Sequence, residues 1–154
     1  MTLLSEIQVG TRAAWVPSAG RIAEWATAAY GSRRISAELA IRIVTPVESR
    51  RLNKTYRHMD KPTNVLSFPA GVALLKQQPQ PLGDLAICAV VVTREARAQG
   101  KTLAAHWAHM VVHGTLHLMG YDHVKNADAQ RMERLERRIL RELGFSDPYL
   151  VSES

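Results

Sequence analysis

The chain has 154 residues, the usual length of one domain, and it can bury about two-thirds of its unfolded surface in a single core. Its composition of 46% hydrophobic and 22% charged residues excludes a disordered or low-complexity chain. The formal net charge of +6 favours a polyanionic partner without identifying one.

The cysteine content and the apolar runs bear on the cellular compartment. Cys88 is the single cysteine, so no internal disulfide can form, and it lies in the apolar run 85–92, where a buried, inert thiol is expected. That run falls far short of the ~20 residues that a membrane-spanning helix requires. The first residues lack the basic and apolar pattern of a secretion signal. We therefore expect a cytoplasmic protein that contacts no membrane.

The first part of the chain predicts two strands and two helices in alternation. The N-terminal residues are expected to form a strand, and Ser18 is expected to cap a helix that Gly31 ends in a left-handed conformation. Residues 39–45 alternate as a half-buried strand does. Thr45 then supplies a capping hydroxyl, a proline stands at the first helical position, and Glu48 follows. A second helix should therefore begin at once.

The second part predicts two more strands and two long helices. Residues 63–68 and 85–92 are expected to be strands, joined by a surface loop over residues 70–83 that is rich in Gln, Pro and Gly. Residues 102–118 are expected to be helical, and an amphipathic helix ends the fold. Four of its side chains should face inward (Met132, Leu135, Ile139 and Leu143) and five outward (Glu133, Arg134, Glu136, Arg137 and Arg138). The whole indicates a single α+β domain over residues 1–154, with a mixed sheet of about four strands covered by about five helices.

Histidines gather on the helix predicted at residues 102–118. His109 and His117 lie about 12 Å apart along a helix axis, too far to share a metal ion at bonds of about 2 Å. His113 and His117 are one turn apart and can chelate. Gly120 breaks the helix, so that His123 can turn back toward the pair as a third ligand. The spacing predicts a metal site at the end of the helix and in the turn that follows it.

The spacing of these three histidines and of the glycine is that of the metzincin zinc sites, and it predicts one zinc ion per chain. Three ligands leave a position open for a water whose pKa zinc lowers toward neutrality, as in catalytic sites. A metalloprotease needs a glutamate directly after the first histidine, and Gly114 stands there. A glycine within a helix indicates a need for room beside the metal or for close backbone packing. His109 and Asp122 are candidates to contact a metal ligand or the substrate.

Two long motifs resemble the YbeY-type endoribonucleases of bacteria: HGTLHLMGYDH at residues 113–123 and NKTYRHMDKPTNVLSFP at residues 53–69. The stretches GDLAIC at residues 83–88 and AHWAHMVVH at residues 105–113 are also similar. The resemblance implies a zinc-dependent, single-strand-specific endoribonuclease. It would mature ribosomal RNA, notably the 3′ end of 16S rRNA, and act in ribosome biogenesis and quality control.

The same resemblance implies roles for individual residues. The family's metal ligands match His113, His117 and His123, and its functional arginine matches Arg57. A guanidinium is permanently charged and offers paired donors to two phosphate oxygens. Without the motif, Arg57 would be interpreted as an ordinary surface charge. Asn64 departs from the aspartate that many relatives have, so a carboxylate role at that position does not carry over.

Alternatives stay open at this point. The expected partners are single-stranded RNA, rRNA and ribosomal particles, with no DNA. A non-catalytic RNA-binding ribosome assembly factor would keep zinc for folding, although structural zinc usually has four protein ligands. A metalloprotease has only the histidine spacing in its favour. For the endoribonuclease, either a zinc-activated water or the RNA 2′-hydroxyl can attack, and only the latter leaves a cyclic 2′,3′-phosphate.

Overall fold

The computed structural model describes residues 3–32, 35–70, 80–121 and 126–149, which form four strands and five helices. In chain order they are β1 (Leu3–Val9), α1 (Ala19–Tyr30), β2 (Ala37–Val44), α2 (Pro46–Arg57), β3 (Val65–Pro69), β4 (Gln80–Cys88), α3 (Ala89–Gln99), α4 (Leu103–Leu118) and α5 (Asn126–Glu142). This α+β architecture confirms the predicted fold class.

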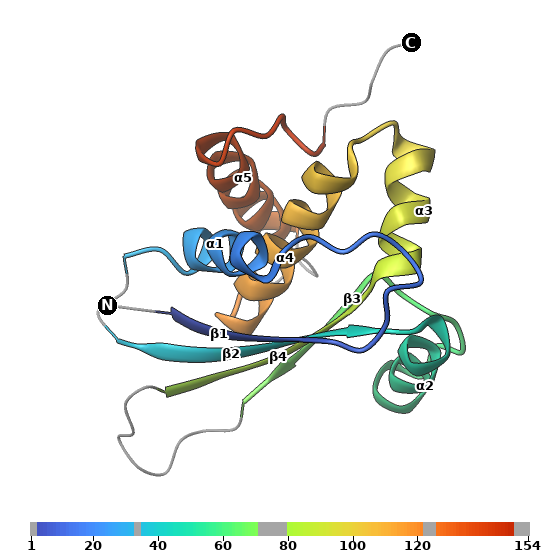
Figure 1. Ribbon diagram of the computed structural model, residues 1–154. Helices are drawn as coiled ribbons and strands as arrows, with labels where there is room; N and C mark the ends of the chain where they lie inside the picture. The colour runs from blue at the N-terminus through green and yellow to red at the C-terminus, as the bar shows by residue number, and fades with distance from the viewer. Residues whose placement is uncertain (1–2, 33–34, 71–79, 122–125, 150–154) are drawn as a thin grey trace.

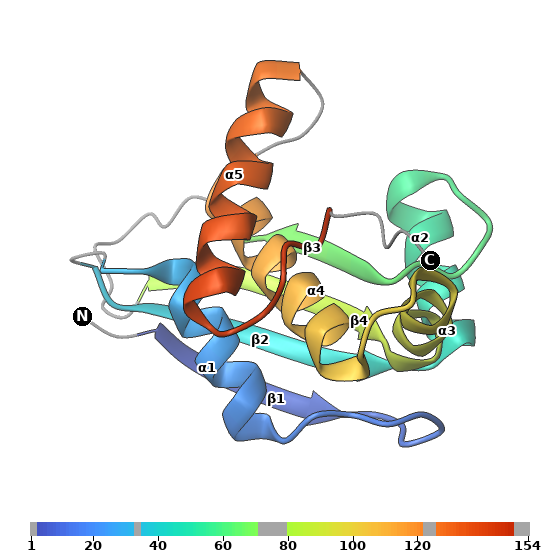
Figure 2. The same ribbon diagram turned by 90° about the horizontal axis from the view of Figure 1, so that it is seen from above.

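The strands form one mixed sheet in the order β1-β2-β4-β3. β1 and β4 both run parallel to β2, whereas β3 runs antiparallel to β4 and forms an edge of the sheet. Helices α1, α4 and α5 lie over one face of the sheet, and α2 lies toward the other side (Figures 1 and 2). None of the five helices in the described residues has the length and apolar character needed to cross a membrane.

The predicted starts of α1 and α2 are confirmed. Each helix begins after a hydroxyl side chain that caps a nearby amide. The side chain of Ser18 accepts a hydrogen bond from the amide of Arg21, and the side chain of Thr45 accepts one from Glu48. Thr102 caps α4 in the same way. The carboxylate of Glu48 does not reach back to the cap but pairs with Arg42, at 2.6 Å. Gly31 ends α1 as expected, but its φ of 73° and ψ of −156° lie outside the left-handed helical region that was predicted.

The prediction of a strand over residues 85–92 is wrong in its second half. β4 ends at Cys88, and Ala89 to Val92 form the first turn of α3. Both segments are buried on more than one side, so neither shows the polar face that separates a strand from a helix. Cys88 stands at the N-cap without a side-chain hydrogen bond to the helix, so no capping signal marked the boundary.

The predicted surface loop over residues 70–83 is also partly wrong. Its last residues, from Gln80 on, belong to β4 and pair with β2 and with the end of β3. A register shift between Glu38 and Leu39 accommodates the Pro81 segment, and Gly83 adopts a φ of 143° beside the carbonyl of Phe68. Proline and glycine therefore mark an irregular strand here. Residues 71–79 lie outside the described residues.

The packing of α4 against the sheet explains the glycine at position 114. A Cβ atom there would lie 2.8 Å from Cδ2 of Leu85, 3.1 Å from its Cδ1 and 3.2 Å from Cγ2 of Val65. Gly114 therefore faces the core between β3 and β4. The glycine was expected to provide either room beside a metal ion or close backbone packing, and the structure shows close packing of the helix backbone against the sheet. A glutamate at this position would point into the core.

We expect Gly114→Ala to lower the free energy of unfolding by about 1 kcal/mol. Overpacking a filled core costs about 1–3 kcal/mol, and the better helix propensity of alanine returns about 1 kcal/mol at most. The measurement is urea unfolding. Gly20→Ala is the matched control in α1, because no atom lies within 4 Å of its added Cβ, and it should be neutral or stabilising. A Gly114→Ala chain more stable than its parent would contradict the close packing.

Candidate functional site

A pocket of about 410 Å³ lies along the edge strand β3. The end of α2 contributes Tyr56 and Arg57, and α4 contributes His113 and His117. The floor comes from β3 and from Asn64 directly before it. Residues about 60 positions apart in the sequence therefore share one cavity, because α4 crosses the sheet beside β3 while α2 ends close by.

The turn between α2 and β3 is held by buried polar side chains, which fixes where Arg57 lies. Asn53 donates to the carbonyl of Lys61 at 2.9 Å. Ser49 both donates to the carbonyl of Thr63 and accepts from its amide, at 3.0 and 2.9 Å. His58, directly after Arg57, adopts the left-handed conformation that ends α2. The chain thus turns sharply past the end of the helix and returns as β3.

The two pocket histidines lie one turn apart on α4, and their ring centroids are 4.8 Å apart. Both rings are half-buried, whereas most of α4 around them is buried. Ser67 of β3 donates to the carbonyl of Gly114 at 3.3 Å and so ties this part of the helix to the edge strand. His113 and His117 thus stand on a rigid part of the fold with access to the pocket.

Glu136 of α5 lies behind this pair and is fully buried. One carboxylate oxygen is 3.0 Å from Nδ1 of His113. The other contacts Nε2 of His109 and accepts a hydrogen bond from the hydroxyl of Tyr149 at 2.9 Å. A carboxylate has only acceptors, so both imidazoles donate to it. The contact with Glu136 sets the tautomer of His113 by placing its hydrogen on Nδ1, so a metal ion would be coordinated through Nε2.

The charge state of Glu136 follows from these contacts. Burial opposes the ionised form and by itself raises the pKa, but the hydrogen bonds from His109 and His113 outweigh it and lower the pKa of Glu136 to about 2. Burial lowers the pKa of His109, despite the neighbouring carboxylate. Burial and the Glu136 charge raise the pKa of Tyr149, so its hydroxyl stays a donor. Glu136 therefore stays ionised behind the pocket.

A second polar chain reaches the pocket through Asn64. Its amide nitrogen donates to Glu95 of α3 at 3.0 and 3.2 Å, and its carbonyl oxygen accepts from the amide of Val65 at 2.6 Å. Glu95 also contacts Nε2 of His106 at 2.9 Å. Burial opposes its ionisation, but the hydrogen bonds from His106 and Asn64 lower the pKa of Glu95. An amide at position 64 thus fits beside a carboxylate, where an aspartate would be repelled.

The predicted site residues are distributed as follows. Arg57, His113 and His117 line one pocket. His109 lies behind it, in contact with Glu136. His123 and Asp122 lie outside the described residues. Three side chains, His109, His113 and Glu136, have ligand atoms within 4.8 Å of one another and could themselves hold a metal ion. This cluster shares His113 with the ligand set that the sequence predicts.

The prediction that Glu136 faces outward with its charged neighbours is wrong. It lies four residues after Met132 and four before Leu140, on the buried side of α5. Leu135 and Leu143, predicted to face inward, are half-buried and pack against the core. An acidic residue within an apolar stripe was the signal that could have identified it. Tyr149 carried no such signal, because its approach depends on how the segment after α5 folds back.

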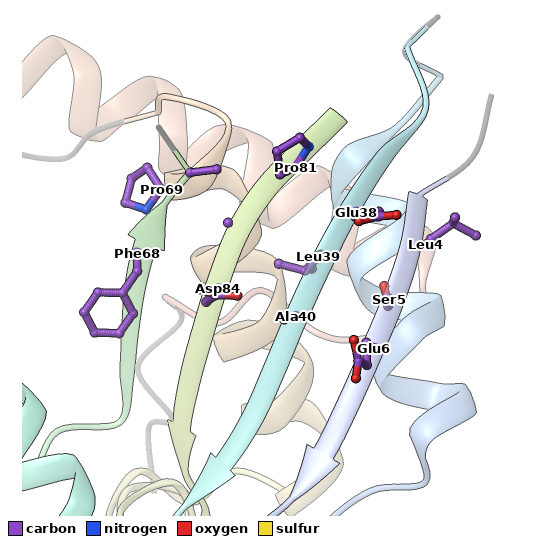
Figure 3. A pocket seen from close by; sticks show the side chains of 12 residues that line it. Leu4, Ser5, Glu6, Glu38, Leu39, Ala40, Phe68, Pro69, Pro81 and Asp84 are labelled. Atoms are coloured by element: carbon purple, nitrogen blue, oxygen red, sulfur yellow. The ribbon is translucent and has the colours of Figure 1, made fainter. Parts of the chain in front are cut away.

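A different pocket, of about 450 Å³, lies on the face of the sheet away from α4 (Figure 3). Glu6 of β1, Glu38 of β2 and Asp84 of β4 stand on three adjacent strands there (Figure 3). Three carboxylates disfavour phosphate groups. In a chain of net charge +6, the histidine pocket with Arg57 is the better place for an anion.

Comparison with known proteins gave two findings. A family model described as "Endoribonuclease YbeY" matches residues 12–144 of the chain. Among solved structures, the solution structure of TM1509 (VT1) from Thermotoga maritima matches with a TM-score of 0.50 and 22% sequence identity. The match covers 96% of this chain and 99% of that one. At this identity, the second finding supports the fold alone.

Proposed function

The chain belongs to the YbeY endoribonuclease family, and we propose on that premise that it is a zinc-dependent endoribonuclease specific for single-stranded RNA. In this proposal His113, His117 and His123 hold one zinc ion, and Arg57 holds the phosphate of the bond that is cleaved. Its substrate is ribosomal RNA, including the 3′ end of 16S rRNA, within ribosomal particles of the cytoplasm.

The observation that carries the proposal is the pocket at the edge of β3, where Arg57 and the pair His113 and His117 line one cavity. Imidazole nitrogens are preferred zinc ligands, and a guanidinium matches phosphate oxygens. A phosphate that enters this cavity meets both kinds of group at once. Metal-assisted cleavage of a phosphodiester can use both groups, one as Lewis acid and one to stabilise negative charge.

The chemistry of the side chains favours the ion in this cavity over the buried cluster of His109, His113 and Glu136. In the cluster, the carboxylate already accepts hydrogen bonds from both histidines and from Tyr149. A cation there would displace those donors, and two of its three ligands, His109 and Glu136, are buried. With the ion in the cavity, the Glu136 contact instead orients His113 and raises its basicity, as carboxylates commonly do behind zinc-binding histidines.

In the proposed reaction, the zinc ion, Arg57 and Asn64 have different roles. When bound, zinc supplies Lewis-acid chemistry and lowers the pKa of water toward neutrality. Arg57 binds phosphate oxygens and offsets the negative charge that develops on them. Asn64 lines the pocket with its amide hydrogen-bonded to Glu95 and to the amide of Val65, and it adds no negative charge beside the anion. Analysis of the product ends for a cyclic 2′,3′-phosphate identifies the nucleophile.

The test of this function compares two substrates and two metal states. Zinc-loaded chain should cleave a single-stranded RNA, the chelated chain should not, and neither should cleave casein. Readdition of zinc should restore cleavage. RNA binding without cleavage in either state would favour the assembly factor, and casein cleavage would favour a protease.

We expect Glu136→Gln to weaken zinc binding about 10- to 100-fold, the usual effect of removing a group that orients a zinc ligand. A glutamine places an amide N–H where one of three donors now points, so His113 loses its fixed partner. Competition with a zinc-chelating dye measures the change. The matched control is Glu133→Gln on the same helix, where the side chain is 39% exposed. Equal zinc affinity in both variants would remove Glu136 from the site.

A further inference from the structure

We propose that Tyr56 is a stacking platform for one unpaired base of the RNA, next to the phosphate that Arg57 holds. This inference rests on the proposed endoribonuclease function and adds to it the part of the substrate that gives single-strand selectivity. The two residues are adjacent at the C-terminal end of α2, and both line the pocket that contains His113 and His117.

The Tyr56 ring is both accessible and held in place. The residue is 63% exposed, among the most exposed large apolar or aromatic residues in the described part of the chain. Its ring meets Phe68 edge to face, with centroids 5.1 Å apart and an angle of 71° between the planes. Phe68 is half-buried. It packs against a buried apolar cluster that is formed by Val44, Leu66, Ala86, Cys88 and Val91. A ring fixed by one such contact loses little further freedom when a base stacks on it.

An exposed tyrosine at the end of a helix is, by itself, an ordinary surface residue. The position of Tyr56 in the pocket distinguishes it. Trp15 is also exposed, at 44%, but it follows β1 at the opposite edge of the sheet and lines none of the pockets described above. Tyr56 instead stands where an RNA strand must pass if one of its phosphates reaches Arg57.

Stacking on this ring explains selectivity for strandedness without selectivity for sequence. Every base has a π-face, so stacking on an aromatic side chain tolerates any base. A base within a duplex is covered by its neighbours and must be unstacked first, which costs free energy. An unpaired nucleotide beside the cleaved phosphate can therefore occupy the Tyr56 platform, and a paired one is disfavoured.

The experiment uses short single-stranded RNAs that each carry one abasic nucleotide, at successive positions. Fluorescence anisotropy measures their binding to the chelated full chain, and single-turnover cleavage by the zinc-loaded chain follows. For the parent, one position beside the cleavage site should lose about 5- to 150-fold in affinity, the range measured for one stacked base. Tyr56→Ala should lose the same factor with intact RNA and show no further loss with that abasic RNA.

Three further variants make the result decisive. Tyr56→Phe and Tyr56→Trp keep an aromatic face and should bind as the parent does, and Trp15→Ala is the matched control for loss of an exposed ring. Equal affinity of Tyr56→Ala and the parent for intact RNA would overturn the proposal. So would a loss in Tyr56→Phe as large as in Tyr56→Ala. If the parent binds RNA with an abasic penalty that depends on Tyr56 but never cleaves it, the proposed function fails and the platform stands.

Discussion

Arg57→Ala is expected to cleave single-stranded RNA about 100- to 1000-fold more slowly than the parent at saturating zinc. Loss of one preorganised donor to a developing oxyanion commonly has this effect, equivalent to roughly 3–4 kcal/mol. Arg57 is exposed at the end of α2, so the melting temperature and the zinc content should stay nearly unchanged. Single-turnover cleavage, thermal unfolding and elemental analysis measure the three quantities.

Two variants separate the specific role of Arg57 from its charge. Arg57→Lys should recover only part of the rate, because an ammonium keeps the charge but lacks the planar pair of donors. Arg51→Ala removes a charge from an exposed arginine of the same helix that does not line the pocket, and it should cleave at nearly the parent rate. Parent-like cleavage by Arg57→Ala would return this residue to an ordinary surface charge.

His117→Ala is expected to abolish stoichiometric zinc binding and, with it, cleavage. Removing a group that only orients a zinc ligand costs 10- to 100-fold in affinity, so removing a ligand itself should cost more than about 100-fold. His117 is half-buried at the pocket and contributes little to the core, so the chain should still fold. Elemental analysis should give about one zinc per parent chain and almost none in the variant. His123→Ala should behave in the same way.

His109→Ala is the matched control, because His109 belongs to the buried cluster but not to the proposed zinc ligands. It should keep one zinc per chain, with affinity lowered only as far as the Glu136 carboxylate loses its orientation. The opposite pattern, with zinc lost in His109→Ala and retained in His117→Ala, would assign the ion to the cluster of His109, His113 and Glu136.

Local interactions account for what could be predicted from the sequence. The caps at Ser18, Thr45 and Thr102 each join a hydroxyl to an amide three residues away, so the neighbouring sequence determines them. The spacing of His113 and His117 sets their separation along any helix. Alternation in residues 39–45 likewise identified a strand with one buried face. The family motifs identified Arg57 as a candidate site residue, and in the folded chain it lines the same pocket as His113 and His117.

Other features were decided by which elements pack together. The boundary between β4 and α3 at Cys88 carries no local mark, because a buried strand and a buried helix have equally apolar sequences. Gly114 is explained by atoms of Leu85 and Val65 that lie on other elements. Such contacts join residues far apart in the chain, so no neighbouring sequence pattern encodes them.

Glu136 shows most directly the difference between what the local sequence determines and what tertiary packing decides. The sequence by itself determined a charged, amphipathic last helix, and by charge alone Glu136 was assigned to its exposed side. The tertiary structure decided otherwise, because α5 packs on α4 and brings Glu136 against His109 and His113. Two imidazole donors and the Tyr149 hydroxyl replace the water that a carboxylate would otherwise require. A buried charge depends on partners from several elements, and only the folded chain brings those partners together.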